Sequence, residues 1–270
     1  MYDIRVVTEP EDDIFYHMAT DESLFLFSNK SDVSGTLRVY MSKRPGITYG
    51  YFQNITDLNF DYLNRNKIDY VRRITGGRAV IHGDDLTFSF AANRRSHLFD
   101  RSISKITAKF SIIIKRFLES LELSSTITKN DTQSRDIKRN PFCFSSYARN
   151  EIAVHGNKIV GYALKRDADS FLLQGSIPIG FDEELFKNLF VAGDEKGVSR
   201  EFTCLNDIAK ERYDFITLRE IFLSTFSECG FEIHHDNLAK EEAKEAIRLK
   251  GLKYCNPVWN QNRKEFQMVS

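Results

Sequence analysis

Cys143 and Lys158 are the two residues whose type and surroundings point most directly to covalent chemistry. Cys143 follows a polar loop, residues 134–140, and does not lie within an apolar periodic run. A thiol becomes a nucleophile when a neighbouring cation or dipole holds it as a thiolate, and Lys158 and Arg149 are the candidate cations. Most cysteines are inert core residues. We apply that interpretation to the remaining three, which are Cys204, Cys229 and Cys255.

Lys158 lies in an apolar strand pattern directly after a turn at residues 155–157. A lysine in such a place is usually an edge residue whose charged end reaches solvent. A functional lysine there would instead meet a buried anionic or polarised group. Both interpretations are open from the sequence.

Two adjacent glycines, Gly76 and Gly77, follow another strand pattern. Such a pair lets a turn adopt unusual dihedral angles and leaves its N–H groups bare, so the loop could approach a carbonyl, carboxylate or phosphate. Arg73 and Arg78 would add charge and forked donors. The spacing fits neither the Walker phosphate loop nor the dinucleotide fingerprint. On the glycines alone, a plain hairpin turn is the simpler interpretation.

Periodic patterns predict the elements that must position these residues. Helices are expected at 15–27, 57–66, 102–121, 182–189, 217–229 and 237–250, and strands at 36–41, 46–52, 70–73, 86–91, 151–154, 158–164, 171–179 and 231–234. Strands arrive in clusters separated by helices, which favours an α/β fold of the α+β type, a mixed, largely antiparallel sheet flanked by helices. We predict one domain over residues 1–270, with a C-terminal helical segment from about 236 packing on it.

Bulk properties exclude several classes of function. Lys plus Arg and Asp plus Glu total 38 each, so no net positive field is available for nucleic acid. No run approaches ~18 apolar residues, so no membrane span is expected. The start has no basic and apolar signal pattern, and the four scattered cysteines suit reduced thiols in a cytoplasm. The six histidines form no metal-binding pattern.

Several segments together resemble the biotin/lipoate protein ligase superfamily, and within it the lipoate-protein ligase and octanoyltransferase branch. RRITGGRAVIH at 72–82 is similar to the lipoyl-binding loop of that group, and GNKIVGYA at 156–163 to its strand with the active-site lysine. MATDESL at 18–24, GYFQN at 50–54 and LLQGSI at 172–177 match further elements in order. The resemblance implies the catalytic-domain fold of that superfamily and covers roughly residues 18–181.

The resemblance also assigns roles to residues. It implies that Cys143 and Lys158 are catalytic, and that the acyl substrate is bound by Arg73, Gly76, Gly77, Arg78, Ala79, His82 and Gly161. The form with Arg78 after the two glycines is similar to the cysteine-dependent octanoyltransferases, which carry a nucleophilic cysteine in a Cys-Phe context, here Cys143-Phe144. The one-chain ligases have an accessory C-terminal domain, which we do not expect here. Residues 149–151, however, resemble an Arg-Asn-Asp stretch of many ligases.

The leading hypothesis that follows is an acyltransferase. It would move an octanoyl or lipoyl group from acyl carrier protein, through a thioester on Cys143, to a lysine of a lipoyl-domain protein or the glycine-cleavage H protein, without a cofactor. Lys158 would donate to the carbonyl oxygen, and Val80, Phe88 and Tyr162 are candidates to line an acyl tunnel. One alternative is a lipoate-protein ligase that needs ATP and Mg²⁺ and acts through lipoyl-AMP. Another is a non-catalytic relative that only binds carrier proteins.

Overall fold

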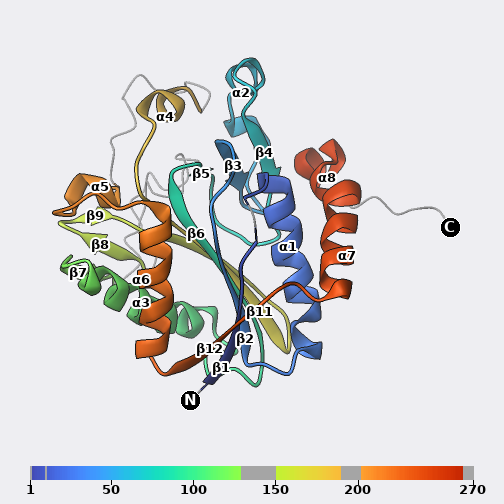
Figure 1. The fold of residues 1–270 in the computed structure, drawn as a ribbon. Helices are drawn as coiled ribbons and strands as arrows, with labels where there is room; N and C mark the ends of the chain where they lie inside the picture. Colours follow the sequence, from blue (N-terminus) through green and yellow to red (C-terminus); the bar gives the residue numbers. More distant parts are fainter. Residues whose placement is uncertain (1, 10, 129–149, 190–201, 264–270) are drawn as a thin grey trace.

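A six-stranded sheet forms the centre of the computed structural model, which describes the chain except for residues 1, 10, 129–149, 190–201 and 264–270 (Figure 1). The strands, in spatial order, are β10 (Gly161–Arg166), β11 (Ser170–Pro178), β6 (Asp85–Asn93), β2 (Gly35–Tyr40), β1 (Tyr2–Val7) and β12 (Phe231–Asp236). The pairs from β10 to β2 are antiparallel, whereas β1 runs parallel to β2 and β12. The predicted mixed, largely antiparallel sheet is therefore confirmed.

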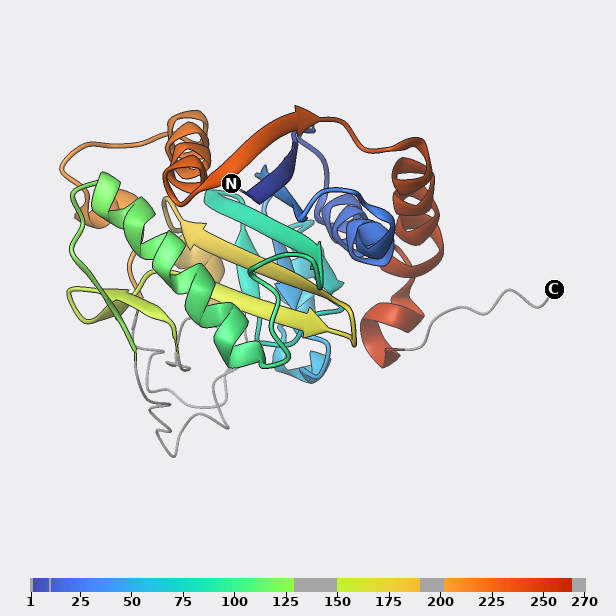
Figure 2. The ribbon, with the colours of Figure 1, turned by 90° about the horizontal axis from the view of Figure 1, so that it is seen from below.

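Helices cover both faces of this sheet (Figures 1 and 2). On one face, α3 (Ile103–Ser120) and α6 (Phe215–Glu228) pack against alternate residues of β6 such as Phe88 and Phe90. On the other face, α1 (Ile14–Phe27) packs against Ala91 and Leu172, and α7 (Lys240–Leu249) packs against α1. The period-two alternation of the strands thus divides the core into two layers.

Two three-stranded sheets flank the main one. The first consists of β4 (Asp69–Arg72), β3 (Gly46–Tyr49) and β5 (Val80–His82), and the second of β7 (Ser125–Ile127), β8 (Ile152–Val154) and β9 (Asn157–Lys158). The first sheet has its own apolar cluster, which includes Ile47, Tyr49 and Leu63. It carries the glycine pair in the loop between β4 and β5.

The prediction of one strand over 158–164 was wrong. The chain leaves the small sheet after β9 and enters the main sheet as β10, which pairs with β11 instead of β8. Ile159 and Val160, between the two strands, are fully buried, so the apolar pattern continues while the pairing partner changes. Apolar periodicity indicates which residues are buried but does not indicate which strand they pair with, so it cannot separate β9 from β10.

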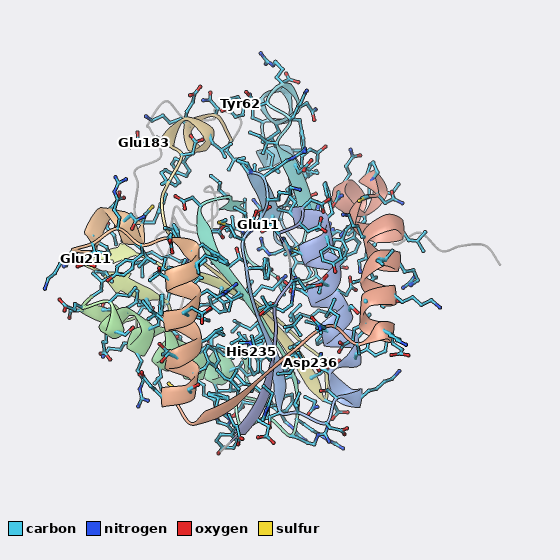
Figure 3. All side chains as sticks on the ribbon, in the orientation of Figure 1. Glu11, Tyr62, Glu183, Glu211, His235 and Asp236 are labelled. Atoms are coloured by element: carbon cyan, nitrogen blue, oxygen red, sulfur yellow. The ribbon has the colours of Figure 1, made fainter. Side chains whose placement is uncertain are left out.

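The remaining elements are short. They are η1 (Ser28–Lys30), η2 (Ile55–Asp57), α2 (Phe60–Arg65), α4 (Glu183–Leu189), α5 (Leu205–Ile208), the π-helical turn η4 (Lys250–Tyr254) and α8 (Pro257–Asn262). Acidic side chains such as Glu183, Glu211 and Asp236 lie on the outside (Figure 3). Among the helices of the described ranges, none has the length and apolar character that a membrane crossing requires.

Candidate functional site

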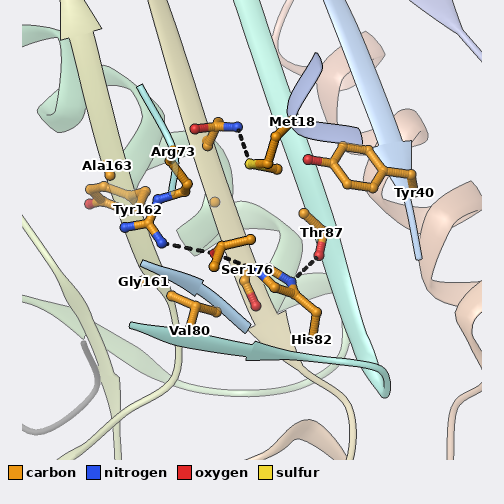
Figure 4. A pocket seen from close by; sticks show the side chains of 13 residues that line it. Met18, Tyr40, Arg73, Val80, His82, Thr87, Gly161, Tyr162, Ala163 and Ser176 are labelled. Carbon is orange, nitrogen blue, oxygen red and sulfur yellow. Dashed lines mark hydrogen bonds between the residues drawn. The ribbon is translucent and has the colours of Figure 1, made fainter. Parts of the chain in front are cut away.

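A pocket open to solvent is bounded by α1, the main sheet and the glycine-bearing small sheet (Figure 4), and its empty space, solvent at the mouth included, is about 350 Å³. Its lining comprises Met18 of α1, Tyr40 of β2, Thr48 of β3, Arg73, Val80 and His82 around the glycine loop, Thr87 of β6, Gly161, Tyr162 and Ala163 of β10, and Gln174, Gly175 and Ser176 of β11. Segments from both halves of the chain therefore meet here. The mixture of apolar and hydrogen-bonding side chains suits a small ligand with an apolar tail and a polar end.

Backbone contact fixes the glycine loop between β4 and β5. Gly77 has a φ of +84°, in the left-handed region that glycine tolerates. A Cβ placed on Gly50 would lie 1.8 Å from the carbonyl oxygen of Gly77. The backbone at Gly50 therefore packs directly against the glycine loop. Gly76 and Arg78 are half-buried, Gly77 is exposed and Ala79 is buried.

Arg73 holds this loop in shape. Its Nη2 donates to the carbonyl oxygens of Gly76 and Arg78, at 2.8 and 3.0 Å, and its Nη1 donates to Thr48 Oγ1 at 2.8 Å. The side chain is buried, and Thr75 Oγ1 accepts from its Nε. Arg73 therefore organises the loop that was expected to bind the acyl group, while it also forms part of the pocket wall.

A relay of hydrogen bonds continues from Arg73 across the pocket. Thr48 Oγ1 lies 2.8 Å from His82 Nε2, and His82 Nδ1 lies 2.9 Å from Asp85 Oδ2. Because Thr48 already accepts from Arg73, its single hydroxyl proton is available for His82 Nε2. With a donor on Nε2, the N–H at Nδ1 faces the Asp85 carboxylate. The imidazole is thus oriented from both sides.

Asp85 is buried beneath the pocket and accepts hydrogen bonds at four places. Besides His82, the hydroxyls of Thr87 and Ser176 donate to it at 2.5 and 2.7 Å, and the N–H of Gly83 at 3.1 Å. Burial alone would raise the pKa of the Asp85 carboxyl, but His82 and these donors together hold that pKa below its usual value. Asp85 is therefore a fixed anion at the pocket.

A second buried carboxylate, Asp21 of α1, contacts two other residues of the pocket wall. It accepts from Tyr40 Oη at 2.8 Å, from Gln174 Nε2 at 2.7 Å and from Arg38, with which it forms an ion pair. Gln174 in turn accepts from Thr75 Oγ1 at 2.7 Å. Burial, followed by the charge of Asp21, raises the pKa of the Tyr40 hydroxyl well above its usual value. Hydrogen bonds therefore connect α1, the sheet and the glycine loop.

Lys158 is fully buried, and its Nζ lies 2.5 Å from Glu151 Oε1. The residue belongs to β9, in the hairpin that precedes the pocket-lining strand β10, and is not itself among the pocket-lining residues. Of the two interpretations left open by the sequence, the structure excludes a lysine whose charged end reaches solvent. The amine meets a buried anion instead.

Apart from Lys158, the predicted site residues fall into three groups. Arg73, His82 and Gly161 line the pocket, as do Val80 and Tyr162, whereas Phe88 is buried in the core against Phe222. The loop residues Gly76, Gly77, Arg78 and Ala79 lie beside it. Cys143 lies outside the described residues, as does Arg149. The binding and catalytic roles of all these residues stay predictions.

Sequence reasoning missed part of the pocket wall. It did not single out Met18, Tyr40, Thr48, Thr87, Gln174 or Ser176. A signal existed for two of them, because Gln174 and Ser176 alternate within an otherwise apolar strand and so share one face. Polar residues at that spacing in a buried strand require partners on the same side.

One group in the described ranges has the geometry for a metal ion. It consists of Asp3, Glu232 and His234, exposed on β1 and the edge strand β12. Exposed acidic groups of this kind are common without an ion, and β12 lies at the sheet edge opposite the pocket strand β10. We therefore assign the group no role.

Comparisons with known proteins show the family to which the chain belongs and the fold that it shares. Octanoyltransferase LipM of Clostridioides difficile is 30% identical over 259 residues, covering 92% of this chain and 94% of that protein. Octanoyltransferase LipM of Bacillus subtilis is 28% identical over 262 residues, with the same two coverages. Among solved structures, the bi-partite lipoate protein ligase of Thermoplasma acidophilum shares the fold, with a TM-score of 0.80 at 20% identity and 100% coverage of both chains. The lipoyl protein ligase A/B catalytic domain profile matches residues 13–227, more than half of the sequence. The chain therefore belongs to the lipoyl protein ligase A/B catalytic domain family.

Proposed function

We propose that this chain is an octanoyltransferase of protein lipoylation. The observation that carries the proposal is the match, over 92% of the chain, to curated relatives named Octanoyltransferase LipM. The pocket supports it, because a hollow with a mostly apolar lining beside a glycine loop suits a medium-chain acyl group. Each buried CH₂ contributes about 0.8 kcal/mol to binding, so an octanoyl chain would be held firmly.

The reaction we propose has two transfers. In the first, the Cys143 thiolate attacks the thioester carbonyl of the donor, the bond from carbonyl carbon to donor sulfur breaks, and the departing donor thiolate takes up the proton that Cys143 had lost. In the second, the amine of an acceptor lysine attacks the enzyme thioester, an amide forms, and the Cys143 thiol is regenerated. The first transfer exchanges one thioester for another and the second is downhill to an amide, so we propose that neither ATP nor Mg²⁺ is required.

The roles at the site follow from the same proposal. Lys158 would stabilise negative charge on the carbonyl oxygen. The loop of Gly76 and Gly77 would let that carbonyl come close to backbone N–H groups that no side chain covers. Arg73 and His82 would keep the loop and the pocket wall in place through their contacts with Thr48. We propose acyl carrier protein as the donor.

For the acceptor we propose a lipoyl-domain protein or the glycine-cleavage H protein. The Thermoplasma acidophilum ligase was described together with its E2 lipoyl domain, which supports an acceptor of this class. We propose that the reaction takes place in the cytoplasm. The described cysteines support this, because Cys204, Cys229 and Cys255 are all free thiols.

The proposal is tested by mixing the protein with octanoyl-acyl carrier protein in the absence of ATP and recording the mass of the intact protein. We expect an octanoyl adduct that peptide mapping places on Cys143, and transfer of that adduct to a lipoyl-domain protein added afterwards. Cys143→Ala should form no adduct. The matched control is Cys255→Ala, which removes an exposed thiol and should leave adduct formation unchanged.

Two results would contradict the proposal. A protein that stays unmodified without ATP, but forms lipoyl-AMP when lipoate, ATP and Mg²⁺ are supplied, is a ligase. A protein that binds the carrier and shows unchanged behaviour in every acyl assay after Cys143→Ala is a non-catalytic relative. In either case Cys143 has no role in transfer.

A further inference from the structure

The contact between Glu151 and Lys158 is the most buried lysine–carboxylate pair in the described part of the chain. Lys158 is 1% exposed at its side chain and Glu151 8%, and their charged atoms lie 2.5 Å apart. Glu151 comes directly before β8, and Lys158 ends β9, its partner in the hairpin. A buried charged group needs a partner that replaces water. The Glu151 carboxylate is that partner for the Lys158 amine.

Glu151 is itself held from two sides. Its N–H donates to Thr128 Oγ1 at 3.0 Å, and its carbonyl oxygen accepts from the N–H of Thr128 at 2.8 Å. The preceding residue, Asn150, has a φ of 67°, which asparagine tolerates better than most residues. The Asn150 amide donates to Ser104 and Thr107 on α3. The backbone that carries the Glu151 carboxylate is therefore hydrogen-bonded, through Asn150, to α3.

Lys158 is fixed at its backbone as well. Its carbonyl oxygen accepts from the N–H of Thr203 at 2.9 Å. The chain then passes through Ile159 and Val160 to Gly161, where the pocket wall begins. Tyr162, also in that wall, donates to the carbonyl oxygen of Asn150. Burial raises the pKa of Tyr162 above its usual value, and the charge of Glu151 adds to this to a smaller degree.

We propose that Glu151 is the positioning residue for Lys158: it fixes the direction of the buried ammonium relative to the acyl pocket. The inference rests on the proposed function for the role of Lys158 and adds Glu151 to it. An ammonium has three N–H groups, so a fixed partner on one of them sets the directions of the other two. Misplacing a catalytic group by ~1 Å can lower a rate about 10²-fold.

A double-mutant cycle on the rate of acyl transfer tests this role. Lys158→Met is expected to lower kcat by about 10²–10³-fold, the usual loss for one oxyanion donor. Glu151→Gln is expected to lower kcat by about 10²-fold with KM little changed, and Glu151→Asp, which keeps the charge, should recover part of the rate. Because Glu151 acts through the lysine, the double variant should be no slower than Lys158→Met alone. The matched control is Glu122→Gln, which breaks an exposed ion pair with Lys210 and should leave kcat unchanged.

A second measurement does not depend on turnover. The buried ammonium of Lys158 should give a slowly exchanging ¹⁵N resonance, identified by its loss in Lys158→Met. Glu151→Gln should shift or abolish this resonance, while Glu122→Gln should leave it in place. Urea unfolding of each variant establishes that it is folded, and Glu151→Asp serves for both measurements where the glutamine variant does not fold.

The outcomes separate the two proposals. The positioning role is overturned by a Glu151→Gln protein that keeps the wild-type kcat and resonance. It is also overturned if Glu151→Gln lowers the rate of the Lys158→Met protein by the same factor as it lowers the wild-type rate. Absence of any Cys143 adduct in the wild-type protein overturns octanoyl transfer instead. That result is distinguishable, because the resonance and its dependence on Glu151 are observed without substrate.

Discussion

Asp21 is fully buried in the middle of α1. A carboxylate is an unusual residue on the buried face of a helix. Asp21 accepts hydrogen bonds from Arg38 and Tyr40 on β2, Ser89 on β6 and Gln174 on β11. A buried charge is tolerated when paired and hydrogen-bonded. These contacts therefore specify how α1 lies on the sheet, and so the position of one wall of the pocket.

The buried residue His17, near Asp21 in α1, leads to a prediction about how stability depends on pH. It is buried, its Nε2 lies 3.2 Å from the carbonyl oxygen of Met41, and Arg38 lies against its Nδ1. Burial, followed by the charge of Arg38, lowers the pKa of His17 from 6.5 to about 3. Below pH 6.5 the unfolded chain therefore takes up a proton that the folded chain does not. Stability should fall by about 1.4 kcal/mol per pH unit from this residue as the pH drops from 6.5 toward 3.

Urea unfolding at pH 7 and pH 5 measures this dependence. His17→Gln keeps one N–H donor and one acceptor but does not titrate, so its loss of stability between these pH values should be smaller than that of the wild type by about 2 kcal/mol. His234→Gln changes an exposed residue and should keep the wild-type slope. Identical slopes in the wild type and His17→Gln would show that His17 is not held neutral in the folded state.

At the residue scale, the sequence allowed part of the site to be predicted. Arg73, His82 and Gly161 were predicted from the resemblance to a known family, and all three line the pocket. The partners of Asp21 could not be found in this way, since Arg38 and Gln174 come from distant strands whose order in the sheet no local pattern reports. Lys158 was identified, whereas its pairing with Glu151 depends on the hairpin register.

At the scale of elements, the glycine loop depends on the segment after β3 as much as on its own glycines. Gly50→Ala would put a Cβ 1.8 Å from the carbonyl oxygen of Gly77, and backbone has to move to relieve that overlap. We expect a loss of about 1–3 kcal/mol in unfolding free energy. We also expect a higher KM for the acyl donor, because the loop carrying Arg78 is displaced. Urea unfolding and initial rates measure the two effects.

Gly251→Ala is the matched control for that substitution. It lies in the π-helical turn η4, and a Cβ there would meet nothing within 4 Å. Both stability and KM should stay at or near the wild-type values. A Gly50→Ala protein that behaved like Gly251→Ala would mean that the loop has room to move and that its contact with Gly50 is not required.

Element prediction succeeded where one periodic pattern was long enough. α3 carries an apolar stripe over five turns of helix, and its bounds differ from the prediction by one residue at each end. Shorter elements such as β5, β7 and α5 carry no period of their own. Their conformations are fixed by neighbouring strands and by the core, which local patterns do not report.

At the scale of the whole molecule, the C-terminal helices are tied to the structural base of the site. Asn260 of α8 accepts from the N–H of Arg72 at 2.9 Å, and its carbonyl oxygen accepts from Tyr49 at 2.6 Å. Trp259 Nε1 donates to the carbonyl oxygen of Arg72 at 2.9 Å. Residues near the end of the described chain thus hold the strand from which the glycine loop departs.

A buried ion pair joins the same helices to α1, and it provides the test of the single-domain prediction. Glu22 of α1 accepts from Lys253 Nζ at 2.8 Å and from Tyr254 Oη at 2.7 Å. Glu22→Gln leaves the Lys253 ammonium buried opposite a neutral amide, which should cost about 3–5 kcal/mol. If α1 and the C-terminal helices belong to one cooperative unit, the whole urea transition should move to a lower midpoint with its slope unchanged.

The control is Glu183→Gln, which removes one half of an exposed pair with Lys187 and should change stability by less than about 1 kcal/mol. Two separate transitions in Glu22→Gln, of which only one is shifted, would mean that the C-terminal helices unfold independently and that residues 1–270 are not one domain. Amide hydrogen exchange locates the effect, because protection of α7, α1 and β4 should decrease together in a single unit. A loss of hydrogen-exchange protection at β4 is the most demanding test of a single unit. That strand contacts α8 through Asn260, whereas the substituted pair is formed by Glu22 and Lys253.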